Sequence, residues 1–334
     1  MTDELDHIWT VGADTTGEAG PEAAEAAVAY QVETLSGVLP LGPQLGVSAP
    51  EVVPAALAPV LLGGDPALQV FALLDGAKVD NLPERLEASD LPHACLFDNV
   101  EDLGVAAPWL VAVSADAPLT RQLFTQGQGP RALWDADTGV FLRSAEALPD
   151  LRARLRKFTK VRTEAGAAAT FFRFWEPRVM ARYLLAHDAA ARAPLCALIG
   201  AGEMIAVDRH NDRAVHAVCQ APDLRAPRVW PNLREDLAPI RLEIFCEDLA
   251  DRIATDIPPL AEVPRAERRE TVTALVNAAR AIGLRANKSV ERYCLTALLI
   301  GAQPETDPRF AKVLNSDRHE LDRSRLMLKL AKDL

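Results

Sequence analysis

The stretch of sequence that decides the fold is Phe171-Phe-Arg-Phe-Trp-Glu-Pro-Arg-Val-Met-Ala-Arg-Tyr-Leu-Leu185. Its aromatic first part is typical of a half-buried strand. Pro177 has a fixed φ angle and no N–H donor, and both properties favour the first position of a helix. The residues that follow place apolar side chains at helical spacing on one face: Val179, Met180, Tyr183 and Leu184. The stretch therefore predicts a strand that ends at a helix N-terminus, with Arg173 and Arg178 on either side of the corner.

Short apolar runs alternate with helical patterns before this corner. We expect strands at 68–74, 94–97, 109–113 and 140–143, and helices at 52–62, 83–89, 119–127 and 149–159. Strands that alternate with helices indicate an α/β (α+β) lobe with a mixed sheet.

The pattern changes after a helix predicted at 177–191. Two short alternating runs, 204–209 and 214–219, flank His210-Asn-Asp-Arg213 and predict a hairpin. A Pro-rich interval follows, and helical periodicity then returns at 237–257, 266–284, 289–300, 307–314 and 318–332. Gly283 and Gly301 stand where C-terminal caps of helices belong.

These patterns predict four segments. Residues 1–50 form an acidic, low-complexity tail with a short helix at 21–35, residues 51–190 an α/β lobe, residues 191–235 a hairpin and Pro-rich connector, and residues 236–334 a helical C-terminal lobe. Because residues 1–45 have few large apolar side chains, we expect their deletion to leave the melting transition nearly unchanged.

The composition is that of an ordinary globular chain, since 49% of the 334 residues are hydrophobic and 25% are charged. The formal net charge is -11, but residues 1–50 hold eight acidic residues and no Lys or Arg, which leaves the rest nearly neutral. A neutral body does not favour nucleic-acid binding. The chain has neither an apolar stretch of membrane-spanning length nor the basic and apolar regions of a signal peptide, so we expect a cytoplasmic protein without stable membrane insertion.

The cysteines favour a reduced protein. There are five, an odd number, and they are widely spaced without any CxxC pair: Cys95, Cys196, Cys219, Cys246 and Cys294. This arrangement is typical of buried thiols rather than of a disulfide framework.

Two motifs could indicate a cofactor or a metal, and we expect neither. Gly200-Ala-Gly202 lacks the third glycine and the strand–helix context of a dinucleotide site, and it suits a tight turn before the hairpin. His210, Asp212, His216 and Cys219 could be drawn as metal ligands, but the hairpin places the first two in its turn.

Asp75 follows a predicted strand, at the edge of the sheet where α/β enzymes often place active sites. No HExxH, GxSxG, Walker or Cys-His-Asn arrangement supplies a catalytic partner, so we predict no catalytic residue. We expect instead that Asp75 forms a partly buried ion pair with Arg173 or Arg178. Such a pair would join the first strand of the lobe to the corner that contains Glu176.

The helix at 149–159 is basic on one side. Leu151, Leu155 and Phe158 are spaced to face the core, while six Lys and Arg side chains lie within 152–162. A solvated charged face is the first interpretation. The second is a docking surface for an acidic partner or for the acidic tail, with Arg152, Arg156 and Lys160 at its rim.

Five short pieces, in this order, resemble the signature of bacterial type VI secretion effector chaperones or adaptors that carry the domain DUF4123. The pieces are Phe71-Ala-Leu-Leu-Asp-Gly-Ala77, Ala107-Pro-Trp-Leu-Val111, Gly139-Val-Phe-Leu-Arg-Ser144, Leu148-Pro-Asp-Leu-Arg-Ala-Arg-Leu-Arg156 and Arg173-Phe-Trp-Glu-Pro-Arg178. The resemblance implies that Asp75, Arg173, Glu176, Pro177 and Arg178 are a structural signature. Trp175-Glu176 stands where the family has an aromatic residue and Asp, so a role that needs the shorter carboxylate is not implied.

The resemblance implies a non-enzymatic chaperone without a cofactor. Such a protein binds the N-terminal or transmembrane-like segment of a toxin effector in the cytoplasm and helps to load it onto the VgrG spike protein. The alternative is a hydrolase or transferase with an unrecognised site near Asp75 and Glu176. Co-purification with a neighbouring toxin would support the first hypothesis, and turnover that is lost in Asp75→Asn would support the second.

Overall fold

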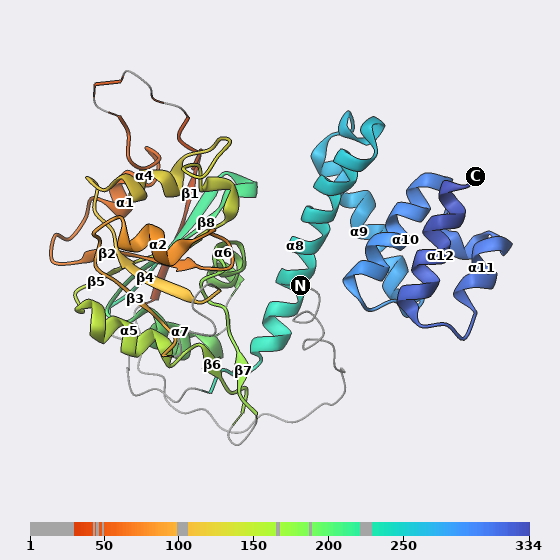
Figure 1. Cartoon of the computed structure of the whole chain (residues 1–334). Coiled ribbons are helices and arrows are strands. Elements are labelled where there is room, and N and C mark those ends of the chain that lie inside the picture. Colours follow the sequence, from red (N-terminus) through yellow and green to blue (C-terminus); the bar gives the residue numbers. More distant parts are fainter. Residues whose placement is uncertain are drawn as a thin grey trace. The chain divides into compact units, whose positions relative to one another are not determined.

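The computed structural model describes residues 30–42, 44, 47, 48, 50–98, 106–164, 168–186, 189–220 and 229–334. These residues form two compact units, 30–240 and 241–334, and the boundary between them falls inside the long helix α8 (Leu233–Asp256) (Figure 1). The first unit contains all the strands of the described residues, and the second is helical. An α+β unit followed by a helical unit confirms the predicted fold class.

A seven-stranded sheet forms the centre of the first unit, in the order β1-β9-β8-β5-β2-β4-β3. Its strands are β1 (Tyr30–Ser36), β2 (Gln69–Asp75), β3 (His93–Cys95), β4 (Pro108–Ala112), β5 (Gly139–Ser144), β8 (Gly202–Asp208) and β9 (Arg213–Cys219). Every pairing between them is antiparallel, whereas alternation of strands and helices in the sequence had indicated a mixture of directions. A second, small sheet pairs β6 (Lys160–Val161) with β7 (Thr170–Phe171).

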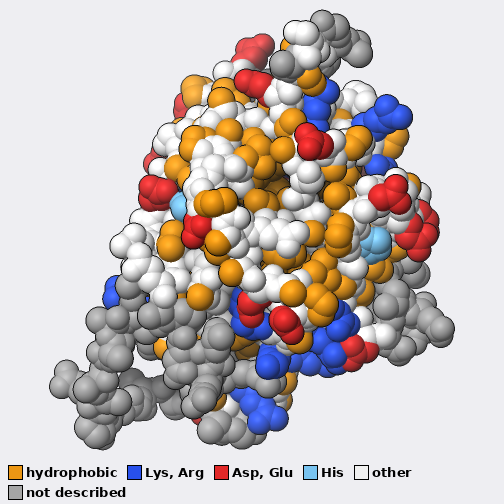
Figure 2. All heavy atoms as spheres, turned by 90° about the vertical axis from the view of Figure 1, so that its left-hand side faces the viewer, with side chains coloured by type: hydrophobic (Ala, Val, Ile, Leu, Met, Phe, Trp, Pro, Cys, Tyr) orange, Lys and Arg blue, Asp and Glu red, His pale blue; other side chains and the backbone are white. Residues whose placement is uncertain are grey.

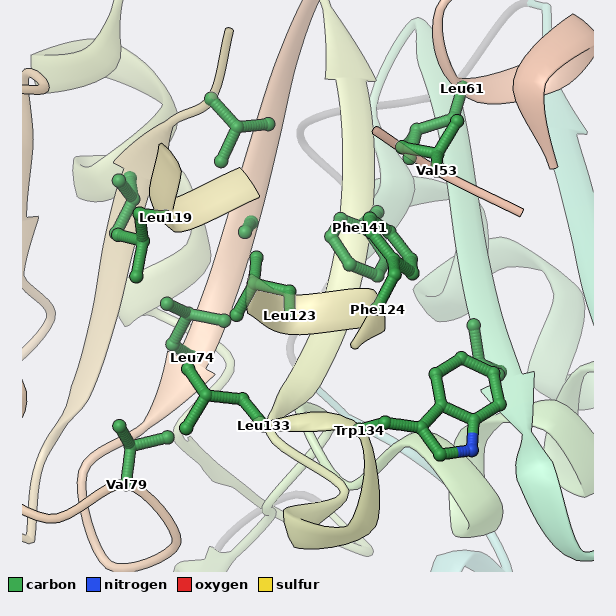
Figure 3. Close-up of a cluster of buried hydrophobic side chains, with 14 of the residues drawn as sticks. Val53, Leu61, Leu74, Val79, Leu119, Leu123, Phe124, Leu133, Trp134 and Phe141 are labelled. Carbon is green, nitrogen blue, oxygen red and sulfur yellow. The ribbon is translucent and has the colours of Figure 1, made fainter. Parts of the chain in front are cut away.

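Helices cover both faces of the large sheet. On one face, alternate side chains of the strands pack with α1 (Ala58–Leu61), α2 (Leu82–Glu87) and α4 (Pro118–Phe124). Figure 3 shows part of this core, in which Phe124 of α4 stacks on Phe141 of β5 with ring centroids 5.1 Å apart. The opposite face is covered by α5 (Leu148–Arg156), α6 (Pro177–Ala186) and α7 (Ala189–Ile199). Burial on both faces explains why the central strands read as continuous apolar runs.

The predicted hairpin is confirmed, but it is not a connector. Strands β8 and β9 pair along their whole length, and the 3₁₀ turn η3 (Arg209–Asn211) joins them. β8 also pairs with β5, so the hairpin continues the large sheet. The boundary expected at residue 191 was therefore wrong, because β8 and β9 belong to the same sheet and the same compact unit as the strands before them.

Residues 30–36 were expected to lie in the acidic tail, and 21–35 to be partly helical. Both expectations are wrong for residues 30–36, which form β1 and pair with β9 from Tyr30 opposite Cys219 to Ser36 opposite Arg213. Leu35 packs against the core. The sequence did not predict this strand, because an edge strand of mixed polarity has little periodicity in its apolar residues. Residues 1–29 lie outside the described residues.

The predicted helices mostly agree with those observed. The C-terminal part of α8 and the helices α9 (Arg265–Ala281), α10 (Asn287–Ile300), α11 (Pro308–Leu314) and α12 (Glu320–Lys332) enclose a core with Tyr293, Phe310 and Met327 at its centre. Gly283 and Gly301 adopt positive φ angles at helix ends, as expected of C-terminal caps. The helix expected at 52–62 is reduced to α1, and the one expected at 177–191 overlaps α6 and the first residues of α7.

Shortening the chain to begin at residue 38 should lower its melting temperature by about 4 °C or more, because β9 loses its strand partner and the core loses Leu35. Thermal denaturation followed by circular dichroism measures this. The Gln31→Ala variant of the full chain keeps the ladder and should melt like the parent. An unchanged transition in the shortened chain would restore the view that this segment is dispensable.

Candidate functional site

Asp75 ends β2 and lies at the start of a tight turn. Its main-chain N–H donates to the carbonyl of Thr138 at 2.7 Å, which continues the pairing with β5. Its Oδ1 accepts a hydrogen bond from the N–H of Ala77 at 3.0 Å, an arrangement that closes an Asx turn. Its Oδ2 accepts from Nη2 of Arg173 at 2.6 Å. With only 3% of the residue exposed, both carboxylate oxygens are occupied by partners inside the protein.

The helix of the acid–proline corner begins at Pro177 as predicted, but the strand expected before it is limited to Thr170–Phe171, and residues 172–176 lie outside any strand. The N–H of Glu176 donates to the carbonyl of Arg173 at 3.1 Å, and the carbonyl of Glu176 accepts from Met180 at 2.9 Å as α6 begins with Pro177. Arg173 contacts two carboxylates, since its Nε also lies 3.6 Å from Oε1 of Glu176. The guanidinium therefore bridges the end of β2 and the start of α6, and the predicted ion pair is confirmed with Arg173. Arg178 is buried on α6.

Aromatic side chains hold the corner in place. Phe172 packs against Tyr183 and Trp230, with ring centroids 6.4 Å and 5.0 Å apart. The indole N–H of Trp230 donates to the hydroxyl of Tyr183 at 2.5 Å. Phe174 and Trp175 lie edge to face at 5.3 Å. Because these rings are fully buried, the corner is a rigid part of the core, and only Phe171 of the aromatic run is exposed.

The three predicted rim residues do not share one environment. Arg152 donates from Nε to the carbonyl of Cys95 at 2.5 Å and from Nη2 to Oδ1 of Asp98 at 3.1 Å. Arg156 donates to the same Asp98 oxygen at 2.6 Å. Lys160 lies beyond the helix, exposed in β6. Two of the three cations are thus paired within the protein, while the expected apolar face of Leu151, Leu155 and Phe158 is buried.

Arg154 is one of the six cations within 152–162 for which a solvated face was expected, but it is buried. Its Nε donates to both oxygens of Glu146, at 3.1 and 2.8 Å, and its Nη atoms donate to the carbonyls of Ala197, Leu198 and Ile199 at the C-terminal end of α7. A cation at this position satisfies carbonyls that have no partner inside the helix. Its spacing could have identified it, because Arg154 falls between Leu151 and Leu155 on the apolar face of α5.

The GxG motif is explained by the same contacts. Gly200 has a φ angle of 77°, and a Cβ atom on it would lie 2.6 Å from Nη2 of Arg154. Gly202 pairs with Ser144 in the sheet, and a Cβ atom there would lie 2.2 Å from the carbonyl oxygen of Arg143. Both glycines are thus required for close packing. Gly200 precedes the hairpin as the turn interpretation expects, whereas Gly202 already belongs to β8.

A second polar network crosses the sheet. The two ring nitrogens of His216 on β9 lie 2.8 Å from Oε1 of Glu33 and 2.9 Å from Oε2 of Glu203. Glu203 in turn accepts from Nη1 of Arg143 at 2.9 and 3.0 Å. The network connects four neighbouring strands, because its members lie one on each strand: Glu33 on β1, His216 on β9, Glu203 on β8 and Arg143 on β5. The sequence reading considered His216 only as a metal ligand.

The cysteines are all buried and free, as predicted. Burial raises the pKa of the Cys95 and Cys246 thiols and raises that of Cys294 to about 12. A hydrogen bond with Cys219 raises the pKa of Cys196 further. These four thiols are therefore protonated and poor nucleophiles. Within the part of the chain that the structure describes, no three His, Cys, Asp or Glu residues form a group that could hold a metal ion.

One region of the chain, which contains the corner and the basic helix, matches a known domain model. Residues 70–193 match the model of the domain of unknown function DUF4123. This DUF4123 region begins within β2 and ends within α7, and it contains Asp75, Arg154 and Arg173. No curated protein and no solved structure matches the chain. Among the described helices, none combines the length and apolar character required to cross a membrane.

Arg173→Ala should destabilise the protein by about 3 kcal/mol, since it leaves the buried Asp75 carboxylate with an uncompensated charge. Adding Asp75→Asn to Arg173→Ala should recover part of this loss, because the amide carries no charge. Urea denaturation of the two single variants and the double variant measures the coupling. Arg131→Ala changes an exposed arginine and serves as the control. Additive losses would contradict the ion pair.

Arg154→Met should destabilise the protein by about 3 kcal/mol, because it removes the partner of Glu146 and of three carbonyls. Gly200→Ala should also destabilise it, since the added methyl group meets the guanidinium and the φ angle is unfavourable. Combining both changes should cost less than their sum, as Met leaves more space than Arg. The same urea measurements test this, and strictly additive effects would argue against direct packing.

Proposed function

We propose that this protein is a non-enzymatic adaptor that binds a type VI secretion toxin effector in the cytoplasm and helps to load it onto the VgrG spike. The observation that carries the proposal is the DUF4123 match over residues 70–193, which spans the five pieces that resemble the effector chaperones. The segment bound would be the N-terminal or transmembrane-like part of the effector.

The geometry of the signature residues supports a scaffolding role. Asp75 is 3% exposed, and its two oxygens bind Ala77 and Arg173. A carboxylate in this position stabilises the junction of β2 and α6 and leaves no oxygen facing solvent for a substrate. We therefore interpret the DUF4123 signature residues as residues that stabilise the fold. Contacts with a partner would be made by exposed residues of the same unit.

Exposed apolar side chains supply contacts for an apolar segment. Figure 2 shows apolar side chains spread across the middle of the face on the left-hand side of Figure 1, with basic side chains gathered along its lower edge. The unit that contains the DUF4123 region has several large apolar side chains more than one-third exposed: Leu39, Val47, Leu62, Phe171 and Leu185. Surfaces that combine apolar contacts with a charged rim are typical of protein interfaces.

The enzymatic alternative places a reaction near Asp75 and Glu176. Glu176 is the more accessible of the two, with 28% of its side chain exposed, but it already contacts Arg173. A hydrolase or transferase would require that Arg173 release one of these carboxylates. We favour the adaptor because the ion pair and the Asx turn give Asp75 a structural purpose without a substrate.

Co-expression with a toxin effector from a type VI secretion gene cluster tests the proposal directly. The tagged protein should retain this toxin on an affinity column and should no longer do so when the toxin lacks its N-terminal segment. Lys160→Glu reverses an exposed cation and should weaken retention in low salt, whereas Arg156→Glu also disturbs Asp98 and needs a melting control. Failure to retain the intact toxin, together with turnover that Asp75→Asn abolishes, would favour the enzyme.

A further inference from the structure

The two outer strands of the sheet differ in how their free edges are treated. In an antiparallel ladder, alternate residues direct both their N–H and C=O groups toward one neighbour, and the residues between them direct theirs away. An outer strand therefore carries a row of hydrogen-bonding groups on its outer side. Which residues carry them follows from the observed register and hydrogen bonds.

The alternation can be followed from β2 to β1. The bond from Asp75 N–H to Thr138 directs the odd-numbered residues of β2 toward β5. In the observed register, the odd-numbered residues of β5 then face the odd-numbered residues of β8, and the even-numbered residues of β8 face the odd-numbered residues of β9. The even-numbered residues of β9 therefore direct their main-chain groups toward β1, where they lie opposite Gln31, Glu33 and Leu35. The main-chain groups of Val32, Thr34 and Ser36 are therefore directed outward.

The same reasoning applied to the other edge agrees with observed bonds. Ala112 N–H donates to Pro92, and Leu96 N–H donates to Pro108, so even-numbered residues of this segment face β4 and odd-numbered ones face outward. The outward carbonyl of Cys95 accepts a hydrogen bond from Nε of Arg152, as stated above. β3 is thus a short edge strand, and α5 supplies a cation to cover its carbonyl.

β1 has no comparable cover within the described part of the chain. It is seven residues long and pairs with β9, and the Tyr30 hydroxyl donates to the carbonyl of Leu184. Among the described strands, none lies on the outer side of Val32, Thr34 and Ser36. It contains no Pro, no Lys and no bulge, which are the usual means by which edge strands avoid pairing. Its only charged residue is Glu33, whose side chain is 59% exposed.

We propose that the outer edge of β1 is a docking site for an extended peptide segment that joins the sheet as an additional strand. The inference rests on the sheet geometry and goes beyond the adaptor proposal, since it specifies a mode of binding for any partner with a suitable segment. Main-chain hydrogen bonds from Val32, Thr34 and Ser36 would supply affinity, as in other cases of strand addition.

The negative charge of Glu33 indicates which side chains the docked segment should carry. A strand beside β1 would place one side chain next to Glu33, on the face that also carries Glu203. A Lys or Arg at this position complements Glu33, and opposite charges on neighbouring strands stabilise a sheet. The adjacent Val32 and Leu35 are partly buried and favour β-branched or other apolar neighbours. The preferred occupant is an extended segment with a basic residue flanked by β-branched residues.

A second copy of this chain is a poorer occupant. When two β1 strands pair antiparallel over all seven residues, Glu33 lies opposite its own counterpart. This would be a non-hydrogen-bonded pair, because Glu33 directs its main-chain groups toward β9, and side chains in such pairs approach most closely. Like charges in direct opposition destabilise the pairing.

Fluorescence anisotropy with a labelled synthetic peptide of Val and Thr around one central Lys tests the proposal on the full chain. Thr34→Pro removes an outward N–H that β9 does not use, and it should weaken binding about tenfold. Thr34→Ala keeps the N–H and should bind like the parent. A peptide with Glu in place of Lys should also bind about tenfold more weakly. Equal binding by the two Thr34 variants would overturn the proposal, as would a parent protein that does not bind the peptide.

The peptide provides a second measurement that does not depend on how a variant folds. N-methylation of alternate peptide residues, in the two possible phases, should abolish binding in one phase and leave it nearly unchanged in the other. The same affinity in both phases would exclude strand addition. Sedimentation of the parent and Thr34→Pro tests the other occupant, since a dimer that this substitution dissociates would assign the edge to a second copy and overturn the peptide assignment.

Discussion

The structure depends on a constraint of the main chain: each N–H and C=O that is removed from water needs a partner. The large antiparallel sheet meets this requirement for its inner strands by pairing on both sides. At β3, where the pairing ends, the guanidinium of Arg152 binds the outward carbonyl of Cys95. At the end of α7, Arg154 does the same for three helix carbonyls. Two arginines of one short helix therefore complete the hydrogen bonding of two other elements.

Buried charges follow the same logic. Asp75 would be costly in the interior without Arg173, and Arg143 without Glu203, because an isolated charge in a medium of low polarity loses its solvation. Each pair joins segments that are far apart in the chain. The Asp75–Arg173 pair connects β2 to the corner before α6, so the register of the strand and the direction of the helix are determined together.

The match to DUF4123 covers less than the folding unit that contains it. Residues 70–193 include β3, β4, β5 and most of β2, but β8 and β9 follow the matched region and β1 precedes it. In the sheet these three strands lie together on one side of β5. The elements outside the match therefore extend the sheet, and β1 among them forms an outer edge that no other described strand covers. A partner that binds this edge would contact a part of the protein that the family model does not describe.

Local sequence determined the elements that carry strong periodicity or distinct end signals. Pro177 and the apolar face after it predicted α6, and the alternation around His210 predicted the hairpin, whereas the strand predicted from the aromatic run is reduced to Thr170–Phe171. Leu151, Leu155 and Phe158 predicted the buried face of α5. These features depend on neighbours within one or two turns or across one tight turn, so a single sequence contains them. The pairing of Asp75 with an arginine of the corner was also predicted, because Asp75 follows a strand and Arg173 and Arg178 flank the corner.

Tertiary structure alone decided which segments complete the sheet and what the basic residues do. β1 became a strand because β9 offered an unpaired edge, and a seven-residue segment of mixed polarity has no periodicity that reports this. Arg152 and Arg156 were expected at the rim of a docking surface because basic residues are concentrated in this helix. Asp98 and the carbonyl of Cys95 lie next to them only after β3 and α5 pack together. Long-range contacts of this kind depend on the register of strands far apart in the chain, and the sequence of any one segment does not contain that register.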